Sequence, residues 1–232
     1  GVVVCDPASI TGLQLRLKGD DAATGAITTW SDSSGNVNDG TGVGSPTGVA
    51  NVLNGHKIVR FVAASTQYFT LPDFMFGFTA GEVFVVLKLN TDPPATDTAT
   101  GLFHFGDNLA FNTHYPYIDG IIYDNFGTTV RKEVGDPTPS LSSAFRLYNP
   151  HSGSGDWEAF LDGTSIFSTG TNTVNFVTGG PLFGKSKAAY YLDGDVAEIL
   201  FYDNVLTSTD RGHVNSYVAD TYALTIANTV SC

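Results

Sequence analysis

The sequence predicts an all-β protein in which two antiparallel sheets pack as one sandwich over residues 1–232, with one short helix near the C-terminus. Three observations predict this class. The chain holds 26 Gly, 16 Phe and 10 Tyr but only 15% charged residues, a composition typical of many short strands joined by turns. Segments with strand composition recur roughly every 10–15 residues, with turn residues between them. Neither an internal repeat nor a linker-like break divides the chain.

The N-terminal part predicts a series of short strands. Leucines at 13, 15 and 17 alternate with polar residues up to Lys18, which predicts a half-buried first strand. A short strand is expected from Ile27 to Trp30. Residues 31–51 are rich in Ser, Gly, Asn and Asp and predict a long surface loop. Further strands are expected over residues 57–62 and 67–71.

The middle of the chain contains the most apolar strand. Residues 82–89 read Glu-Val-Phe-Val-Val-Leu-Lys-Leu, which predicts a strand at the centre of a sheet. Strands are also expected over 101–105, 144–148 and 180–184. Segments 157–161 and 164–167 flank Asp162-Gly163, the strongest hairpin signal in the sequence.

The C-terminal part predicts a turn, a strand and a capped helix. Asp193-Gly194 is typical of a tight turn, and residues 196–202 form a β-branched and aromatic run. Thr207 and Asp210 have the spacing of a capping box. Residues 214, 217 and 218 then fall on one face of a helix.

Charge excludes two classes of partner. The formal net charge is −12, with only 11 Lys and Arg residues, whereas nucleic acids and anionic membranes attract basic surfaces. No apolar run approaches the roughly 20 residues of a membrane-spanning helix. The sequence therefore predicts neither nucleic-acid binding nor membrane insertion.

The only two cysteines, Cys5 and Cys232, lie near opposite ends of the chain. Terminal strands of a sandwich are often neighbours, so the sequence predicts either a disulfide that ties the ends together or two free thiols. A disulfide would indicate an oxidising, extracellular setting.

Four segments together resemble the concanavalin A-like lectin and glucanase superfamily, in its laminin-G-like branch. They are Gly12-Leu-Gln-Leu-Arg-Leu, Trp30-Ser-Asp-Ser-Ser-Gly-Asn, Asn54-Gly-His-Lys-Ile-Val-Arg-Phe, and Asp193-Gly-Asp-Val-Ala-Glu-Ile-Leu-Phe-Tyr-Asp with the helix after it. The resemblance implies a jelly-roll sandwich of two curved antiparallel sheets. The superfamily includes glycan binders, calcium-dependent adhesion modules, glycosidases and virion surface proteins, so the resemblance does not choose among these functions.

A fifth segment, residues 114–127 followed by Arg131, resembles a stretch found in laminin-G-like proteins of phages and environmental bacteria. That resemblance favours a virion or cell-surface role.

Glycoside hydrolysis requires two suitably spaced carboxyl groups. The retaining glucanases of the superfamily carry Glu-x-Asp-x-Glu on one strand, and this chain has only four, widely separated Glu residues. Asp195 and Glu198 are expected on opposite faces of a regular strand. The sequence therefore predicts that the protein is not an enzyme.

Calcium is the cation that the many loop aspartates suit, because it takes several oxygen ligands. The candidate ligands are Asp20, Asp21, Asp193 and Asp195. The alternative is that these aspartates only cap turns through side-chain hydrogen bonds. No cofactor is required by the sequence, and Ca²⁺ is the one ion it offers a place for.

A ligand surface is predicted in the segment 114–131, where aromatic and polar residues alternate around Pro116 and Gly120. Its candidate residues are His114, Tyr115, Tyr117, Asp119, Tyr123, Asp124 and Arg131. Aromatic faces with hydrogen-bonding groups beside them are typical of a concave sugar site. The alternative is that the aromatic residues belong to the core.

Four residues are predicted to have structural roles. Trp30 is expected in the core, and Asp32 in the turn that follows it. Glu198 lies within an apolar strand, and an unpaired buried carboxylate is costly. It is therefore expected to pair with Arg60 or Arg16.

Three functions follow from these observations. The first is a non-catalytic, secreted or surface-displayed laminin-G-like module that binds a glycan or a cell-surface protein. The second is a virion structural protein, a capsid decoration or fibre module, which acts through protein–protein contacts and is compatible with a homo-oligomer. The third is a glycoside hydrolase or lyase.

Overall fold

A computed structural model describes residues 5–95, 99–107 and 112–232. Sixteen strands, three short 3₁₀ helices and one α-helix form within these ranges. All pairings between the strands are antiparallel. The prediction of an all-β antiparallel sandwich with a short C-terminal helix is confirmed.

The large sheet has nine strands in the order β14-β13-β12-β8-β16-β6-β5-β2, with β1 also paired to β16. These strands are β1 (Leu13–Lys18), β2 (Gly25–Ala26), β5 (Thr47–Leu53), β6 (His56–Phe61), β8 (Gly81–Leu89), β12 (Arg146–Gly153), β13 (Asp156–Leu161), β14 (Thr164–Thr169) and β16 (Gly194–Tyr202). The apolar strand β8 lies between β12 and β16, as its composition predicted. Strands β13 and β14 form the predicted hairpin, and Asp162 and Gly163 both have the positive φ that a type I′ turn requires.

A second sheet of five strands has the order β3-β4-β7-β15-β9. Its strands are β3 (Thr29–Trp30), β4 (Gly40–Val43), β7 (Tyr68–Thr70), β9 (Phe103–His104) and β15 (Leu182–Phe183), and β10 (Ile122–Asp124) pairs with β11 (Lys132–Gly135) as a separate ribbon. The helix α1 (Ser208–Tyr222) begins at the predicted cap, where the Thr207 hydroxyl accepts a hydrogen bond from the Asp210 amide. The 3₁₀ helices cover Pro7–Ser9, Gly19–Asp21 and Ala63–Ser65.

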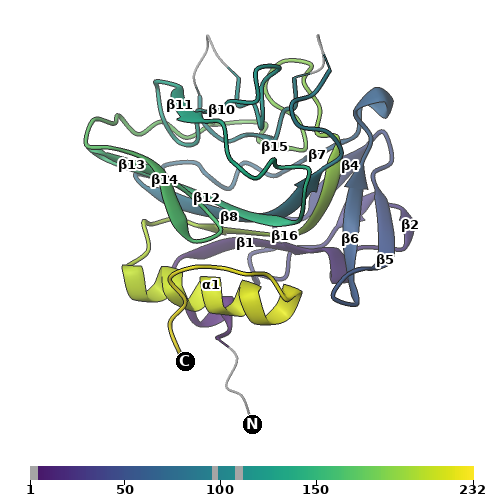
Figure 1. The fold of residues 1–232 in the computed structure, drawn as a ribbon, viewed down its shortest axis with the longest axis horizontal. Helices are drawn as coiled ribbons and strands as arrows, with labels where there is room; N and C mark the ends of the chain where they lie inside the picture. The colour runs from purple at the N-terminus through teal and green to yellow at the C-terminus, as the bar shows by residue number, and fades with distance from the viewer. Residues whose placement is uncertain (1–4, 96–98, 108–111) are drawn as a thin grey trace.

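The large sheet separates two hydrophobic cores. The core between the sheets includes Trp30, Phe69 and Phe201. The core on the other face of the large sheet lies beneath α1 and includes Leu200 and Val214. Figure 1 shows α1 packed against the large sheet beside β1 and β16, with the β10–β11 ribbon at the opposite end of the molecule. Polar and apolar residues alternate along β1, so Arg16 would be expected to face solvent. The helix covers this polar face, and Arg16 is therefore buried.

The prediction of one long surface loop over residues 31–51 is wrong. Strand β4 and most of β5 lie within these residues, and they pair with β7 and β6. Both strands contain glycines that make them look like loop sequence. A Cβ at Gly42 would collide with the Ile27 carbonyl, and a Cβ at Gly48 with the Ala23 carbonyl. The close approach of two backbones requires glycine here, and a strand that contains glycine resembles a loop in its composition.

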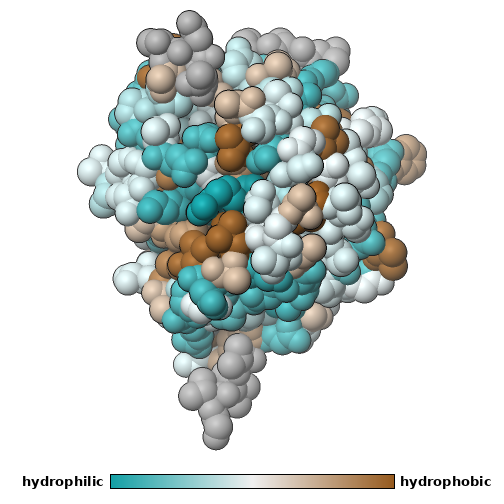
Figure 2. Space-filling view, turned by 90° about the vertical axis from the view of Figure 1, so that its right-hand side faces the viewer, coloured by the Kyte–Doolittle hydropathy of each residue, from teal (hydrophilic) through white to brown (hydrophobic). Residues whose placement is uncertain are grey.

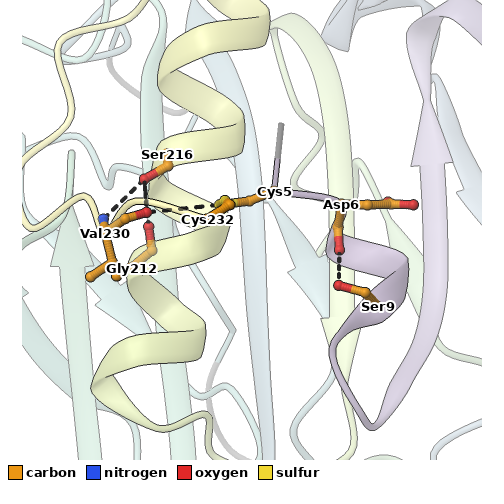
Figure 3. The surroundings of a disulfide bond; sticks show 7 residues. All are labelled: Cys5, Asp6, Ser9, Gly212, Ser216, Val230 and Cys232. Atoms are coloured by element: carbon orange, nitrogen blue, oxygen red, sulfur yellow. Dashed lines mark hydrogen bonds between the residues drawn. A yellow bond between two sulfur atoms is a disulfide. The ribbon is translucent and has the colours of Figure 1, made fainter. Parts of the chain in front are cut away.

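A disulfide joins Cys5 to Cys232, with Cα atoms 5.4 Å apart. Figure 3 shows Val230 beside Gly212 and Ser216 of α1, and Cys232 joined to Cys5. The Ser216 hydroxyl donates to the Val230 carbonyl over 2.8 Å, and the Val230 amide donates to the Ser216 oxygen over 3.0 Å. His213 lies beside the two sulfur atoms, which the disulfide already joins to each other.

Hydrophobic residues on the surface are scattered. Figure 2 shows one side of the molecule, where small hydrophobic patches are separated by polar residues. The large hydrophobic residues exposed in the described ranges are Val37, Val52, Val62, Phe76 and Val130. Single exposed residues of this kind are normal in soluble proteins.

Candidate functional site

The segment 114–123 folds back on itself beside the β10–β11 ribbon. The amide of His114 donates to the Tyr123 carbonyl over 2.7 Å, and the amide of Tyr123 donates back to the His114 carbonyl over 3.0 Å. A tight turn closes the fold-back, since the Gly120 amide donates to the Tyr117 carbonyl over 3.0 Å. This turn places His114, Tyr117 and Tyr123 close together at one end of the sandwich.

Four rings make a continuous series of contacts at this end. The Tyr123 and Tyr117 ring centroids are 6.0 Å apart in an edge-to-face arrangement. Tyr117 lies 4.9 Å from His114, and His114 lies 4.8 Å from Tyr190. The three tyrosines are half-buried, while His114 is buried beneath them. Each exposed ring is therefore held in place by another ring, the geometry that aromatic pairs favour.

Polar groups flank the Tyr123 end of this series. One Asp119 carboxylate oxygen accepts the Ile121 amide over 2.9 Å, and the other accepts the Tyr123 hydroxyl over 3.0 Å. The Arg131 guanidinium lies 4.6 Å from the centre of the Tyr123 ring. A carboxylate, a phenol and a guanidinium thus border the aromatic rings. We call Tyr117, Tyr123, Tyr190, His114, Asp119 and Arg131 the aromatic surface.

His114 acts in this surface as a neutral ring. Burial, together with the positive charge of Arg131, lowers its pKa to about 4. Its Nδ1 atom has no hydrogen-bond partner among the described residues. At neutral pH His114 is therefore uncharged and supports Tyr117 and Tyr190 through ring contacts.

Three of the seven residues predicted as ligand-binding are buried, and two of these, Tyr115 and Asp124, are not part of the aromatic surface. Tyr115 is 1% exposed and packs 4.8 Å from Tyr148. Asp124 is fully buried and accepts hydrogen bonds from the Tyr148 hydroxyl and the Phe126 amide, each over 2.7 Å. Alternation along β10 turns Asp124 inward beside the half-exposed Tyr123. Tyr115 and Tyr117 lie outside a strand, on either side of Pro116, and only Tyr117 is half-exposed.

Tyr190 is a member of the aromatic surface that the sequence did not predict. It lies 76 residues after His114, in the loop that precedes β16. The only sequence feature that marks it is the pair Tyr190-Tyr191, which follows the polar residues 185–187 and precedes β16. That pair does not indicate which segment the two rings approach.

The four predicted calcium ligands are not gathered, and each already has protein partners. Asp20 accepts the Lys57 amide over 2.8 Å and lies 2.6 Å from His56 Nδ1. Asp21 forms an ion pair of 3.7 Å with Lys18.

Asp193 accepts hydrogen bonds from the Ala63 amide and the Asn90 side chain, each over 3.2 Å. The Asp195 carboxylate receives two hydrogen bonds from Arg60, over 2.7 and 2.8 Å. Backbone amides, the Asn90 amide and basic side chains therefore contact these carboxylates.

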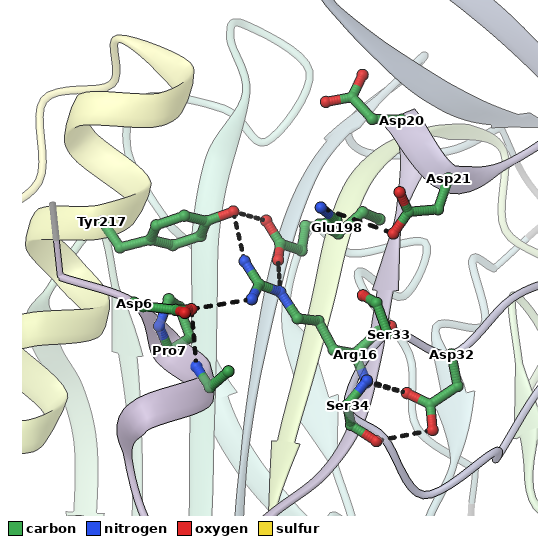
Figure 4. Close-up of polar contacts among 12 residues, drawn as sticks. Asp6, Pro7, Arg16, Asp20, Asp21, Asp32, Ser33, Ser34, Glu198 and Tyr217 are labelled. Atoms are coloured by element: carbon green, nitrogen blue, oxygen red, sulfur yellow. Dashed lines mark hydrogen bonds and ion pairs between the residues drawn. The ribbon is translucent and has the colours of Figure 1, made fainter.

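Glu198 is paired with Arg16, one of its two predicted partners, whereas Arg60 pairs with Asp195. The Arg16 Nε atom donates to Glu198 over 2.9 Å, as Figure 4 shows. The hydroxyls of Tyr217 and Tyr222 also donate to Glu198, over 2.8 and 2.6 Å. Burial alone would lower the pKa of Arg16, but the charge interactions and hydrogen bonds with Glu198 and Tyr217 together outweigh burial and raise it.

The expectation that Asp195 and Glu198 lie on opposite faces of the sheet is wrong. The register of β16 against β8 shifts between Val196 and Glu198, which marks a β-bulge at Ala197. The bulge adds one residue to the alternation, so Asp195 and Glu198 share the face that α1 covers in part. It also lies where the partner of β16 changes from β6 to β1.

The remaining two structural residues lie close to each other. Trp30 is fully buried and donates from its ring nitrogen to the Lys18 carbonyl over 2.7 Å. Asp32 accepts the amides of Arg16, Ser34 and Asn38 over 2.8 to 2.9 Å. Asp32 therefore organises the turn that follows Trp30.

The two sheets and the helix behind the larger one define an antiparallel β-sandwich. Similar in structure is domain 4 of AbnA, an extracellular GH43 arabinanase from Geobacillus stearothermophilus, in complex with arabinotriose. It is 19% identical with a TM-score of 0.64, and the match covers 91% of this chain and 98% of that domain.

Two larger proteins contain the same fold. Trypanosoma rangeli sialidase is 13% identical with a TM-score of 0.63, and the match covers 92% of this chain and 34% of the sialidase. The receptor-binding domain of botulinum neurotoxin mosaic serotype C/D is 12% identical with a TM-score of 0.64, with 88% and 50% covered. This chain thus spans about a third of the sialidase and half of the toxin domain.

No family model and no curated protein matches the sequence. In the described ranges, no helix has both the length and the apolar character needed to cross a membrane.

Proposed function

We propose that this protein is a non-catalytic carbohydrate-binding module of the laminin-G-like type, secreted or displayed on a surface. The aromatic surface is the site through which it binds a glycan. The observation that carries this proposal is the series of ring contacts from Tyr123 through Tyr117 and His114 to Tyr190, in which three half-exposed rings are fixed beside polar groups.

The chemistry of the aromatic surface suits a sugar. The apolar C–H face of a pyranose or furanose packs on an aromatic ring, while its hydroxyl groups need donors and acceptors at the rim. Tyr123 offers the ring, and Asp119 and Arg131 offer an acceptor and donors beside it. Since these side chains already contact one another, little conformational entropy remains to be lost on binding.

Two further observations support the proposal. The arabinanase domain that this chain resembles over 98% of its length is in complex with arabinotriose. The disulfide between Cys5 and Cys232 is of the kind that persists in oxidising, extracellular settings.

The carboxylates nearest to each other on β16 support a role without catalysis. Hydrolysis of a glycosidic bond needs two carboxyl groups that reach the substrate. Glu198 is 1% exposed and held by Arg16 and two tyrosines, and Asp195 is 8% exposed and held by Arg60. Neither presents a free oxygen to a substrate. No cofactor is part of the proposal.

Glycan-array screening followed by calorimetry of the best ligand tests the proposal. Tyr117→Ala and Tyr123→Ala should each weaken binding at least tenfold, about 1.4 kcal/mol, as loss of a central aromatic contact does. Phe76→Ala, at an exposed aromatic residue outside the site, should leave the affinity unchanged. Tyr123→Phe keeps the ring and loses only the hydrogen bond to Asp119. Its affinity should therefore lie between that of the wild type and that of Tyr123→Ala.

Equal binding by the alanine variants and the wild type would refute the site. Binding of no glycan, combined with recovery of the protein within a virion particle, would favour the structural alternative. Release of sugar from any glycan on the array would overturn the non-catalytic role.

A further inference from the structure

Lys185 is held between two tyrosine rings next to the five-stranded sheet. Its ammonium nitrogen lies 5.0 Å from the centre of the Tyr68 ring and 5.6 Å from that of Tyr191. The two ring centroids are 6.1 Å apart. Tyr68 belongs to β7, and Lys185 and Tyr191 face each other in an antiparallel bridge that follows β15. All three side chains are half-buried.

The backbone before Lys185 is adapted to this placement. Gly184 has a φ of +81°, and a Cβ at this position would collide with the Phe61 ring in the core. Glycine permits such a conformation where other residues are strained. The chain can therefore leave β15 directly above the core and bring Lys185 to Tyr68.

Lys185 differs from most other basic residues in how its charge is balanced. Four of the arginines are paired with carboxylates, Arg16, Arg60, Arg146 and Arg211. Lys185 takes part in none of the ion pairs formed by the described residues. Among the described residues, the electron-rich faces of Tyr68 and Tyr191 lie against its ammonium group and stabilise it. In a chain of net charge −12, this is a local positive centre.

This arrangement prepares the ammonium group for an anion. The two rings restrict a side chain that otherwise has several rotatable bonds, so less entropy is lost when a ligand binds. The rings also cover two sides of the ammonium group, which leaves less water to displace. The phenol hydroxyls of Tyr68 and Tyr191 supply hydrogen-bonding groups of the kind that sugar hydroxyls use.

The tyrosine pair around Lys185 adjoins the aromatic surface. Tyr190 contacts His114 in that surface, and Tyr191 contacts Tyr68 here. Tyr190 and Tyr191 are consecutive residues, whose Cα atoms are about 3.8 Å apart, so the two groups of rings are joined through the loop 185–191.

We propose that Lys185, Tyr68 and Tyr191 form a subsite for the acidic group of an anionic saccharide, a carboxylate or a sulfate. Lys185 forms the ion pair, and the two tyrosines fix it and contact the sugar. This inference builds on the proposed glycan-binding function but depends on different residues, so each can fail without the other.

A charge-matched set of oligosaccharides tests the subsite. Calorimetry would compare oligogalacturonides that carry free carboxylates with the same oligomers as neutral methyl esters, and with a sulfated heparin-derived hexasaccharide. The wild type should bind at least one charged oligomer roughly 10- to 100-fold more tightly than the neutral one, as expected for a charge-assisted hydrogen bond. The charged oligomer that binds more tightly shows whether the subsite prefers a carboxylate or a sulfate. Raising the salt concentration should reduce the preference, because ions screen the pair.

Lys185→Gln should remove this preference while binding of the neutral oligomer stays unchanged. Lys88→Gln is the matched control, because Lys88 is half-buried and lies outside the described ion pairs, on β8 of the other sheet. The melting temperature of each variant shows whether it is folded.

The outcomes separate the two proposals. Unchanged discrimination by Lys185→Gln overturns the subsite, and loss of neutral binding in Tyr117→Ala would still support the aromatic surface. Charged ligands that require Lys185 but not Tyr117 support the subsite and overturn the aromatic surface as the main site. Failure of the wild type to prefer any charged oligomer overturns the subsite.

Discussion

Replacement of Glu198 by alanine should destabilise the protein strongly without changing its affinity for any glycan. Glu198 is 1% exposed and accepts hydrogen bonds from Arg16, Tyr217 and Tyr222. The alanine variant leaves the Arg16 guanidinium buried, with Tyr217 and the exposed carboxylate of Asp6 as its remaining partners. Strand β10, which carries Tyr123, lies at the opposite end of the molecule from α1 (Figure 1), so the geometry of the aromatic surface should not change.

The magnitude follows from the environment of the pair. Removal of one partner from a buried ion pair costs about 3–5 kcal/mol, because the other charge stays buried without compensation. For a chain of this length each kcal/mol lowers the melting temperature by about 2–4 °C. Glu198→Ala should therefore melt roughly 6–20 °C below the wild type. Glu198→Gln keeps the side-chain volume and an oxygen acceptor, so its loss should be smaller.

Urea unfolding with the disulfide intact, combined with a double-mutant cycle, provides the assay. Arg16→Met removes the positive charge and keeps an apolar stem beneath α1. The double variant should lose less than the sum of the two single variants, with a coupling energy of at least about 1 kcal/mol. Additive losses, or an unchanged melting temperature of Glu198→Ala, would refute the view that Glu198 and Arg16 stabilise the fold as a pair.

Two further predictions concern buried polar groups. The Tyr115 hydroxyl has no hydrogen-bond partner among the described residues, so Tyr115→Phe should raise the free energy of unfolding by about 1 kcal/mol, whereas Tyr148→Phe, which loses a bond to Asp124, should lower it; a loss in Tyr115→Phe would contradict this reasoning. Burial raises the pKa of Asp124 from 3.8 to about 6. The stability from its neutral form is complete below pH 3.8 and is lost as the pH rises through 6. Urea unfolding should therefore show Asp124→Asn gaining on the wild type by about 3 kcal/mol between pH 3 and 8, and a constant difference would argue against this shift.

Local patterns predicted the elements that local chemistry decides. The central strand β8, the hairpin at Asp162-Gly163 and the capped start of α1 each depend on residues within a few positions of one another. The apolar run, the turn dipeptide and the capping box each form for reasons that lie within the segment itself, so the sequence was sufficient to predict them.

Elements that depend on distant neighbours were not predictable in this way. Strands β4 and β5 contain glycines because a separate segment of backbone passes close to them. The burial of Arg16 depends on α1, which begins 192 residues later in the chain. In both cases the deciding contact is absent from the local sequence, and composition alone indicates a loop or an exposed side chain.

The bulge at Ala197 explains why the sequence alone does not decide whether Arg16 or Arg60 pairs with Glu198. In a regular strand of period two, Asp195 and Glu198 face opposite sides, and either Arg16 or Arg60 is an acceptable partner for Glu198. One inserted residue places both carboxylates on one face, where each meets the arginine of the strand beside it, Arg60 on β6 and Arg16 on β1. The pairing is thus decided by the change of partner strand along β16, which only the tertiary fold creates.

The candidate site combines both kinds of information. Alternation in the segment 114–131 was enough to propose a ligand surface, and five of its seven residues do lie together. Tyr115 and Asp124 are nevertheless buried, a distinction that requires knowledge of which side of the segment faces the core. Tyr190, Tyr191 and Lys185 come from a loop that reaches this end only because β15 pairs with β7 and β9. The proposed glycan site therefore depends on the pairing of the small sheet, and a variant that weakens the pairing of β15 should disturb it.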